Sequence, residues 1–171
     1  MIKRALVAVG LTALVAVSGA GAAVADAPAT HFKANLTGAQ EVPPTGSAAT
    51  GTFQLRLTDN GNKLHFRLRT EGMGRIIQSH IHIGAPGTNG PVVVFFFAPT
   101  PNTADKAITG EDFEVAGVRT PADFSFPAGV TYADFLAKLR AGDTYVNVHS
   151  PSHPGGEIRG QIMPSGEDGE D

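Results

Sequence analysis

The sequence of 171 residues contains no cysteine. This absence excludes disulfide bonds, thiolate catalysis and thiolate metal ligands, and it also excludes a lipid anchor on an N-terminal cysteine. A folded domain built from this chain must therefore be held together by its hydrophobic core alone.

An excess of positive charge is also missing. The chain has 13 lysines and arginines against 16 aspartates and glutamates, so its formal net charge is −3. Because nucleic-acid binding needs a basic surface, nucleic acid is not expected as a partner. No apolar run reaches the length of a membrane span, so no transmembrane segment is expected either.

The N-terminal segment has the pattern of a Sec-type signal peptide. Lys3 and Arg4 form a short basic region, a near-continuous apolar run follows, and an A-x-A cleavage motif ends at Ala25. This order of features is typical of secretory signals. The sequence predicts a signal peptide over residues 1–25, cleavage after Ala25, and a secreted or extracytoplasmic protein.

One domain is expected after the signal peptide, over residues 26–164. The remaining residues, 165–171, read SGEDGED and carry four acidic side chains. Such a segment has no apolar surface to bury, so a disordered acidic tail is predicted.

Short alternating segments separated by turn residues predict an all-β domain. A strand is expected over residues 32–36. Residues 53–58 and 64–69 alternate apolar and polar side chains, and the Asn-Gly turn between them predicts a hairpin. The apolar run VVVFFFA at residues 92–98 predicts a strand covered on both faces, in the middle of a sheet.

One helix is expected late in the chain, where Tyr132, Phe135, Leu136 and Leu139 form a single apolar stripe. Thr131 precedes this stripe as an N-cap, and a glycine follows it. We expect this helix to cover an open end of the β core.

A final hairpin is predicted from residues 144–149 and 157–162, around the loop SPSHPGG. Together these elements predict a Greek-key β-sandwich or flattened barrel of about eight strands with one short helix. One face of this hairpin collects polar side chains: Tyr145, Asn147, His149, Glu157, Arg159 and Gln161.

Histidines on two predicted strands suggest a metal site. His80 and His82 in SHIHIG are two residues apart, so they share one face of a strand. His149 lies on the non-core face of the final hairpin, and His153 in its loop offers a further nitrogen. Imidazoles without sulfur ligands favour Cu(II) or Zn(II).

The alternative is a structural role for the same face. The histidines would then be hydrogen-bonded within a polar network of Asn147, Glu157, Arg159 and Glu41 that rigidifies the patch. In that network Glu41, beside the Pro43-Pro44 turn, is expected to pair with Arg159.

Signs of catalysis are scarce, and no catalytic residue is predicted. No serine sits in a nucleophile-elbow pattern, and the Gly-rich segment 84–92 lacks the Lys-Ser/Thr ending of a phosphate loop. Copper-dependent redox activity is an enzymatic alternative. However, no histidine lies between His82 and His149, so the bridging histidine of copper–zinc superoxide dismutase has no counterpart.

Four segments resemble the chordin-type (CHRD) domain family. They are LTGAQEVPP (36–44), ATGTFQLRLT (49–58), SHIHIGAPGTNGPVVV (79–94) and AGDTYVNVHSPSHPGGEIRGQI (141–162). The chain departs from the usual pattern at His153, where family members often have Asn. The resemblance implies an extracytoplasmic β-rich domain, found alone in secreted microbial proteins, and it implies no established reaction.

The resulting expectation is a secreted binding or scaffold module without catalytic activity, whose partner is an unidentified extracellular ligand or protein. The alternative is an extracytoplasmic copper- or zinc-binding protein that uses His80, His82 and His149.

Overall fold

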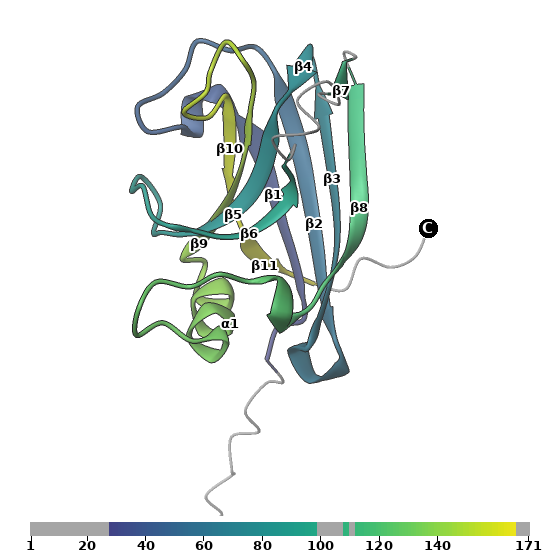
Figure 1. Ribbon diagram of the computed structural model, residues 1–171, viewed down its shortest axis with the longest axis vertical. Helices are drawn as coiled ribbons and strands as arrows, with labels where there is room; N and C mark the ends of the chain where they lie inside the picture. The colour runs from purple at the N-terminus through teal and green to yellow at the C-terminus, as the bar shows by residue number, and fades with distance from the viewer. Residues whose placement is uncertain (1–27, 99–107, 110–111, 167–171) are drawn as a thin grey trace, which may run out of the picture.

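The computed structural model describes residues 28–98, 108–109 and 112–166 (Figure 1). Nine strands of this part of the chain form one antiparallel sheet. They are β1 (His31–Thr37), β2 (Thr50–Thr58), β3 (Lys63–Glu71), β5 (Gln78–Ile83), β6 (Val92–Phe97), β8 (Asp112–Arg119), β9 (Thr144–His149), β10 (Ile158–Gln161) and β11 (Met163–Ser165). The short strands β4 (Arg75–Ile76) and β7 (Ile108–Thr109) pair with each other.

The large sheet curls into a nearly closed, flattened barrel (Figure 1). Its strand order is β6-β5-β9-β10-β1-β2-β3-β8, and β11 pairs with β1 beside β10. The predicted all-β class with one short helix is therefore confirmed. The order places β5 next to β9, although the two strands are far apart in the sequence.

Arg119 of β8 bridges the seam where the barrel does not close. Its Nε donates a hydrogen bond to the carbonyl oxygen of Phe95 at 2.9 Å, and its Nη2 donates to that of Phe96 at 3.0 Å. β6 and β8 are the two ends of the strand order, so here hydrogen bonds from a side chain take the place of backbone hydrogen bonds between neighbouring strands. The guanidinium also lies 5.1 Å from the centroid of the Phe66 ring.

The hydrophobic core fills the barrel because alternate strand residues point inward. On β2 and β3 the inward side chains include Phe53 and Phe66, both buried, while their neighbours are mostly exposed. Phe96 of β6 packs against both rings, with centroid separations of 5.2 Å and 4.2 Å. Aromatic packing across the barrel therefore joins β6, at one end of the sheet, to β2 and β3 near the other end.

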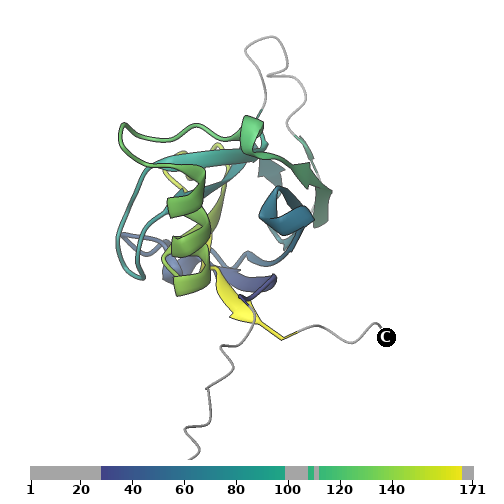
Figure 2. The same cartoon turned by 90° about the horizontal axis from the view of Figure 1, so that it is seen from below.

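Helix α1 (Tyr132–Ala141) covers the lower end of the barrel (Figures 1 and 2). Thr131 and Asp134 form the expected capping box, and Gly142 ends the helix with a φ of 77°, a conformation that suits glycine. Phe135 and Leu139 are fully buried in the core. The predicted helix and its position at an open end are thus confirmed.

The interpretation of residues 92–98 as a central strand is wrong. Residues 92–97 form β6, which lies at one end of the strand order, and Phe95 is 43% exposed. Val93, Val94 and Phe96 are nevertheless buried, since the strand lies over the core at the seam. A central strand and an edge strand whose faces are both covered by side chains have the same apolar sequence pattern, so the pattern cannot distinguish them.

The ends of the predicted domain can be compared only in part. Strand β11 continues to Ser165, which pairs with His31, so the first residue assigned to the acidic tail belongs to the sheet. The predicted signal peptide, residues 1–25, and the acidic residues 167–171 lie outside the described residues. Among the helices of the described chain, none has the length and apolar character needed to cross a membrane.

Candidate metal centre

The candidate site lies on the face of β5 and β9 that points away from the barrel core. The two strands are antiparallel neighbours, with His80 opposite Asn147 and His82 opposite Tyr145. These side chains are buried although they are outside the barrel. The cover includes the loop before β6, where the Gly90 amide donates to the Tyr145 hydroxyl at 3.2 Å.

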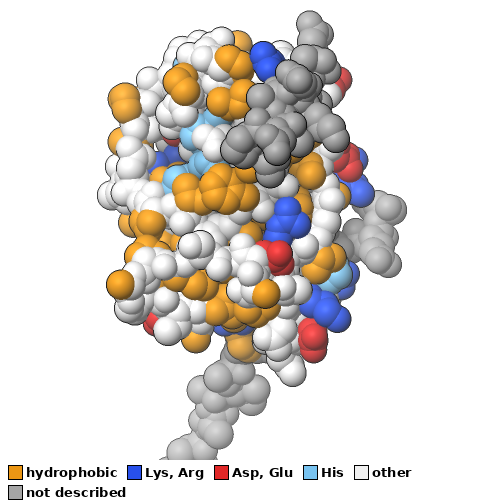
Figure 3. All heavy atoms as spheres, in the orientation of Figure 1, with side chains coloured by type: hydrophobic (Ala, Val, Ile, Leu, Met, Phe, Trp, Pro, Cys, Tyr) orange, Lys and Arg blue, Asp and Glu red, His pale blue; other side chains and the backbone are white. Residues whose placement is uncertain are grey.

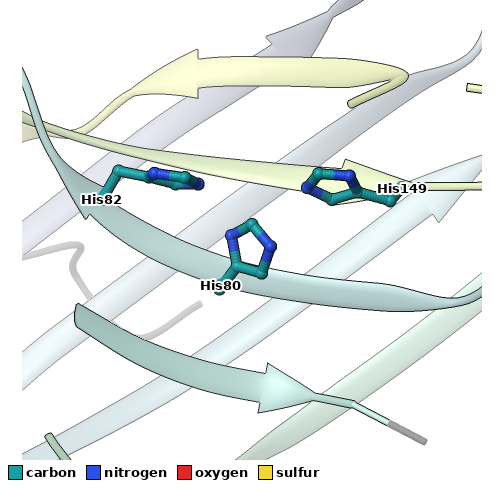
Figure 4. Close-up of side chains that lie close together, drawn as sticks. All are labelled: His80, His82 and His149. Atoms are coloured by element: carbon teal, nitrogen blue, oxygen red, sulfur yellow. The ribbon is translucent and has the colours of Figure 1, made fainter. Parts of the chain in front are cut away.

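Three histidines converge on this face (Figure 4). One ring nitrogen from each of His80, His82 and His149 lies within 4.8 Å of the other two. The ring centroid of His80 is 4.6 Å from that of His82 and 4.6 Å from that of His149. The final hairpin therefore brings His149 to the same face as the other two, as the metal-site hypothesis requires.

Backbone carbonyls fix the tautomers of two of these rings. Nδ1 of His82 donates to the carbonyl oxygen of Gly90 at 2.7 Å, and Nδ1 of His149 donates to that of Pro154 at 2.9 Å. A carbonyl can only accept, so Nδ1 carries the proton in each ring. The lone pair of each neutral ring is consequently on Nε2.

Two nitrogens of the cluster have no hydrogen bond. Nε2 of His149 and Nδ1 of His80 are buried without a partner among the residues that the structure describes. A buried polar atom without a partner costs about 1–3 kcal/mol, so such atoms are rare in folded proteins. Neither nitrogen therefore has a hydrogen bond that would compete with binding to a metal ion.

Burial keeps all three imidazoles neutral. Desolvation lowers the pKa of His82 and of His149, and hydrogen bonds from the ring nitrogens oppose this effect only in part. Desolvation, together with the nearby His149 and His82, lowers the pKa of His80 to about 3. Neutral imidazole is the form that binds metal ions.

Tyr145 packs against the His82 ring, and Arg159 packs against Tyr145. Its ring stacks on Tyr145, and the Arg159 guanidinium lies 3.4 Å from the centroid of the same tyrosine ring. Arg159 is only 1% exposed and donates to the carbonyl oxygen of Thr88 at 2.8 Å and to Oδ1 of Asn89 at 3.2 Å. Arg159 therefore ties β10 to the loop that supplies the Gly90 carbonyl.

Glu41 is buried at the edge of this network. Desolvation raises the pKa of its carboxyl group, while Arg159 and hydrogen bonds from Asn147 and the Val42 backbone lower it. Arg159 therefore acts on Glu41 only through its charge, and no direct ion pair between these two described side chains is formed. Gly156 makes room for the carboxylate, because a Cβ at this position would lie 2.5 Å from Oε1 of Glu41.

His153 is not part of the cluster. Its Nδ1 lies 3.5 Å from Oε2 of Glu157, and no ligand atom of His153 belongs to the convergent group. Glu157 itself is buried and accepts a hydrogen bond from the Ser47 hydroxyl at 2.7 Å. These two residues form a separate contact in the loop between β9 and β10.

Some contributors to the site could not be found from the sequence. The carbonyl groups of Gly90 and Pro154 act through the backbone, so their residue types carry no signal. Phe95 packs edge-on against His80, with ring centroids 5.0 Å apart, and this contact was not expected because residues 92–98 were predicted to form a central strand.

Figure 3 shows histidine side chains reaching one face of the molecule beside hydrophobic ones.

The matched family accounts for nearly all of the described fold. The model of the CHRD domain family matches residues 32–162, which include all three convergent histidines. The chain belongs to the CHRD family. Comparison with curated proteins and with solved structures finds no match. Membership in the CHRD family supports a binding or scaffold module.

Proposed function

We propose that this CHRD domain is an extracytoplasmic, non-catalytic binding module that holds one Cu(II) or Zn(II) ion between His80, His82 and His149. The observation that carries the proposal is the convergence of three buried, neutral imidazoles whose ligand nitrogens lie within 4.8 Å of one another.

The hydrogen-bonding pattern favours a metal site over a purely structural network. A structural role predicts that the ring nitrogens satisfy one another or nearby side chains. Instead, Nε2 of His149 and Nδ1 of His80 lack partners among the described residues. Metal-binding histidines usually donate their second N–H to a carbonyl or carboxylate, as His82 and His149 do here.

The chemistry of the cluster selects the metal. The convergent group consists of histidines, and no carboxylate of the described residues belongs to it. Imidazole nitrogens suit copper and zinc, whereas oxygen-rich sites suit calcium and magnesium. The N-terminal signal pattern supports loading outside the cytoplasm, where the exported protein would meet the ion.

Metal titration of the metal-free, untagged protein tests the proposal. Wild type should bind one Zn(II) or Cu(II) per chain in calorimetry at neutral pH. Its free energy of unfolding should rise by about 2.7 kcal/mol when the free metal is a hundredfold above the dissociation constant. The His80→Ala variant should lose both effects.

His65→Ala is the matched control. His65 lies on β3, where Nε2 contacts the Thr58 hydroxyl at 2.9 Å, well separated in the strand order from β5 and β9. This variant should bind metal like wild type. Equal binding by His80→Ala and wild type would reject the three-histidine site.

A further inference from the structure

We propose that Oδ1 of Asn147 is the fourth protein ligand of the metal ion. This inference rests on the proposed function, because it assigns a residue to the same site. It makes the donor set three imidazole nitrogens and one amide oxygen, and it goes beyond the residues that the histidine pattern indicates.

An unfavourable contact between two acceptors points to Asn147. Nε2 of His82 lies 3.2 Å from Oδ1 of Asn147. Because Nδ1 of His82 donates to the Gly90 carbonyl, a neutral His82 has a lone pair rather than a proton on Nε2. Two lone pairs then face each other without a proton between them. A cation in contact with both atoms removes this repulsion.

Glu41 fixes the orientation of the Asn147 amide. The Asn147 side chain lowers the pKa of the Glu41 carboxyl group, so it favours the carboxylate form, which can only accept hydrogen bonds. The NH2 group of Asn147 must therefore face Glu41. A Cβ at Gly156 would lie 2.5 Å from Oε1 of Glu41 and 3.0 Å from Nδ2 of Asn147, which places these two groups side by side. Oδ1 is left to face His82.

The position of Asn147 suits a fourth corner of a tetrahedron. It lies opposite His80 in the ladder between β5 and β9, and it precedes His149 by two residues on the same face of β9. Ligands at about 2.0–2.2 Å from a tetrahedral ion are about 3.3–3.6 Å from one another. The separation of 3.2 Å between Oδ1 of Asn147 and Nε2 of His82 is close to this value.

The added oxygen narrows the choice of metal. An amide oxygen is a hard ligand, whereas Cu(I) prefers thiolate and thioether sulfur. A neutral set of three nitrogens and one oxygen therefore fits Zn(II) or Cu(II) better than Cu(I). The site should discriminate between the two oxidation states of copper.

Two variants at position 147 separate ligation from positioning. Asn147→Leu keeps the shape and removes both polar groups, whereas Asn147→Asp keeps the oxygen and removes the NH2 group that faces Glu41. If Oδ1 is a ligand, Asn147→Leu should weaken Zn(II) binding at least about tenfold, and Asn147→Asp should bind at least as tightly as wild type. The visible spectrum of the Co(II)-loaded protein should change in Asn147→Leu.

Two outcomes would overturn the assignment while wild type still binds metal. One is wild-type affinity and an unchanged Co(II) spectrum in Asn147→Leu. The other is an equal loss in both variants with an unchanged spectrum, since Asn147 would then only orient its neighbours. Failure of wild type to bind any metal is a different result, and it rejects the proposed function itself.

A crystal structure of the zinc-loaded wild-type protein tests the ligand without any substitution. Oδ1 of Asn147 should lie about 2.0–2.2 Å from the ion. A water molecule or an external anion in the fourth position, with Oδ1 beyond bonding distance, would contradict the assignment even if the variants fail to fold.

Discussion

The imidazole of His82 stacks on the phenol ring of Tyr145, with centroids 4.5 Å apart and 7° between the ring planes. Arg159 contacts the same tyrosine ring and hydrogen-bonds to the loop before β6. That loop carries the Gly90 carbonyl, which binds Nδ1 of His82. His82 is therefore held both by packing and by a hydrogen bond, as a preorganised ligand must be.

Removing the Arg159 side chain should destabilise the protein strongly. Arg159→Ala breaks the contacts to Thr88 and Asn89 and removes a nearby positive charge that favours the ionised form of the buried Glu41 carboxyl group. We expect the free energy of unfolding to fall by about 3–5 kcal/mol in urea denaturation. Arg56→Ala, at an exposed position of β2, should change it by less than about 0.5 kcal/mol. Similar stabilities for the two variants would show that the Arg159 network contributes little.

The stability of the metal-free protein should depend on pH through His80. Its pKa in the folded protein, about 3, is below the ordinary value of 6.5, so below pH 6.5 the unfolded chain binds a proton that the folded protein does not. Stability should therefore decrease as pH falls from 6.5 toward 3, by up to about 1.4 kcal/mol per pH unit from this group.

Denaturant unfolding of the metal-free protein between pH 7 and pH 4 measures this slope. His80→Phe removes one of three titrating histidines and should make the slope less steep over the same window, while His82 and His149, whose pKa values are also lowered, retain part of it. A slope in the variant as steep as in wild type would mean that His80 does not resist protonation in the folded protein.

Gly156→Ala should damage the network around Glu41. The new Cβ would lie 2.5 Å from Oε1 of Glu41, and the φ of +127° at this position is unfavourable for alanine. We expect a loss of about 1–3 kcal/mol in the free energy of unfolding. Gly155→Ala is the matched control, since a Cβ added there would meet no atom within 4 Å. Equal stability of the two variants would contradict this account of Gly156.

Arg119→Ala should loosen the seam of the barrel. The substitution removes the donors to the carbonyl groups of Phe95 and Phe96, so amide hydrogens of β6 should exchange faster with solvent. Arg67→Ala removes an exposed ion pair with Glu114 and should leave exchange in β6 unchanged. Unchanged exchange in Arg119→Ala would show that the side chain does not hold the seam.

Local patterns in the sequence predicted the elements that depend on local interactions. The predicted strand 144–149 coincides with β9, and the capping box at Thr131 begins α1 as expected. The alternation of side chains also placed His80 and His82 on one face. These features depend on strand and helix periodicity, which the sequence carries directly.

Features that depend on long-range pairing could not be predicted in the same way. The position of β6 at the seam depends on how the whole sheet curls, and the apolar sequence of residues 92–98 carries no information about that curvature. Arg159 is buried, and its side-chain hydrogen bonds go to the loop before β6 rather than to Glu41, its predicted partner. The carbonyl of Gly90 reaches His82 only because this loop folds back over β5 and β9.

X-ray absorption spectroscopy of the zinc-loaded wild-type protein is the most direct test of metal binding by the three histidines. The spectrum reports how many imidazole rings bind the ion, because the outer atoms of each ring give a characteristic scattering pattern. Ligation by His80, His82, His149 and Asn147 predicts three imidazoles with Zn–N distances of about 2.0–2.1 Å and one further oxygen ligand. A spectrum that contains one imidazole or none would contradict a metal site formed by His80, His82 and His149.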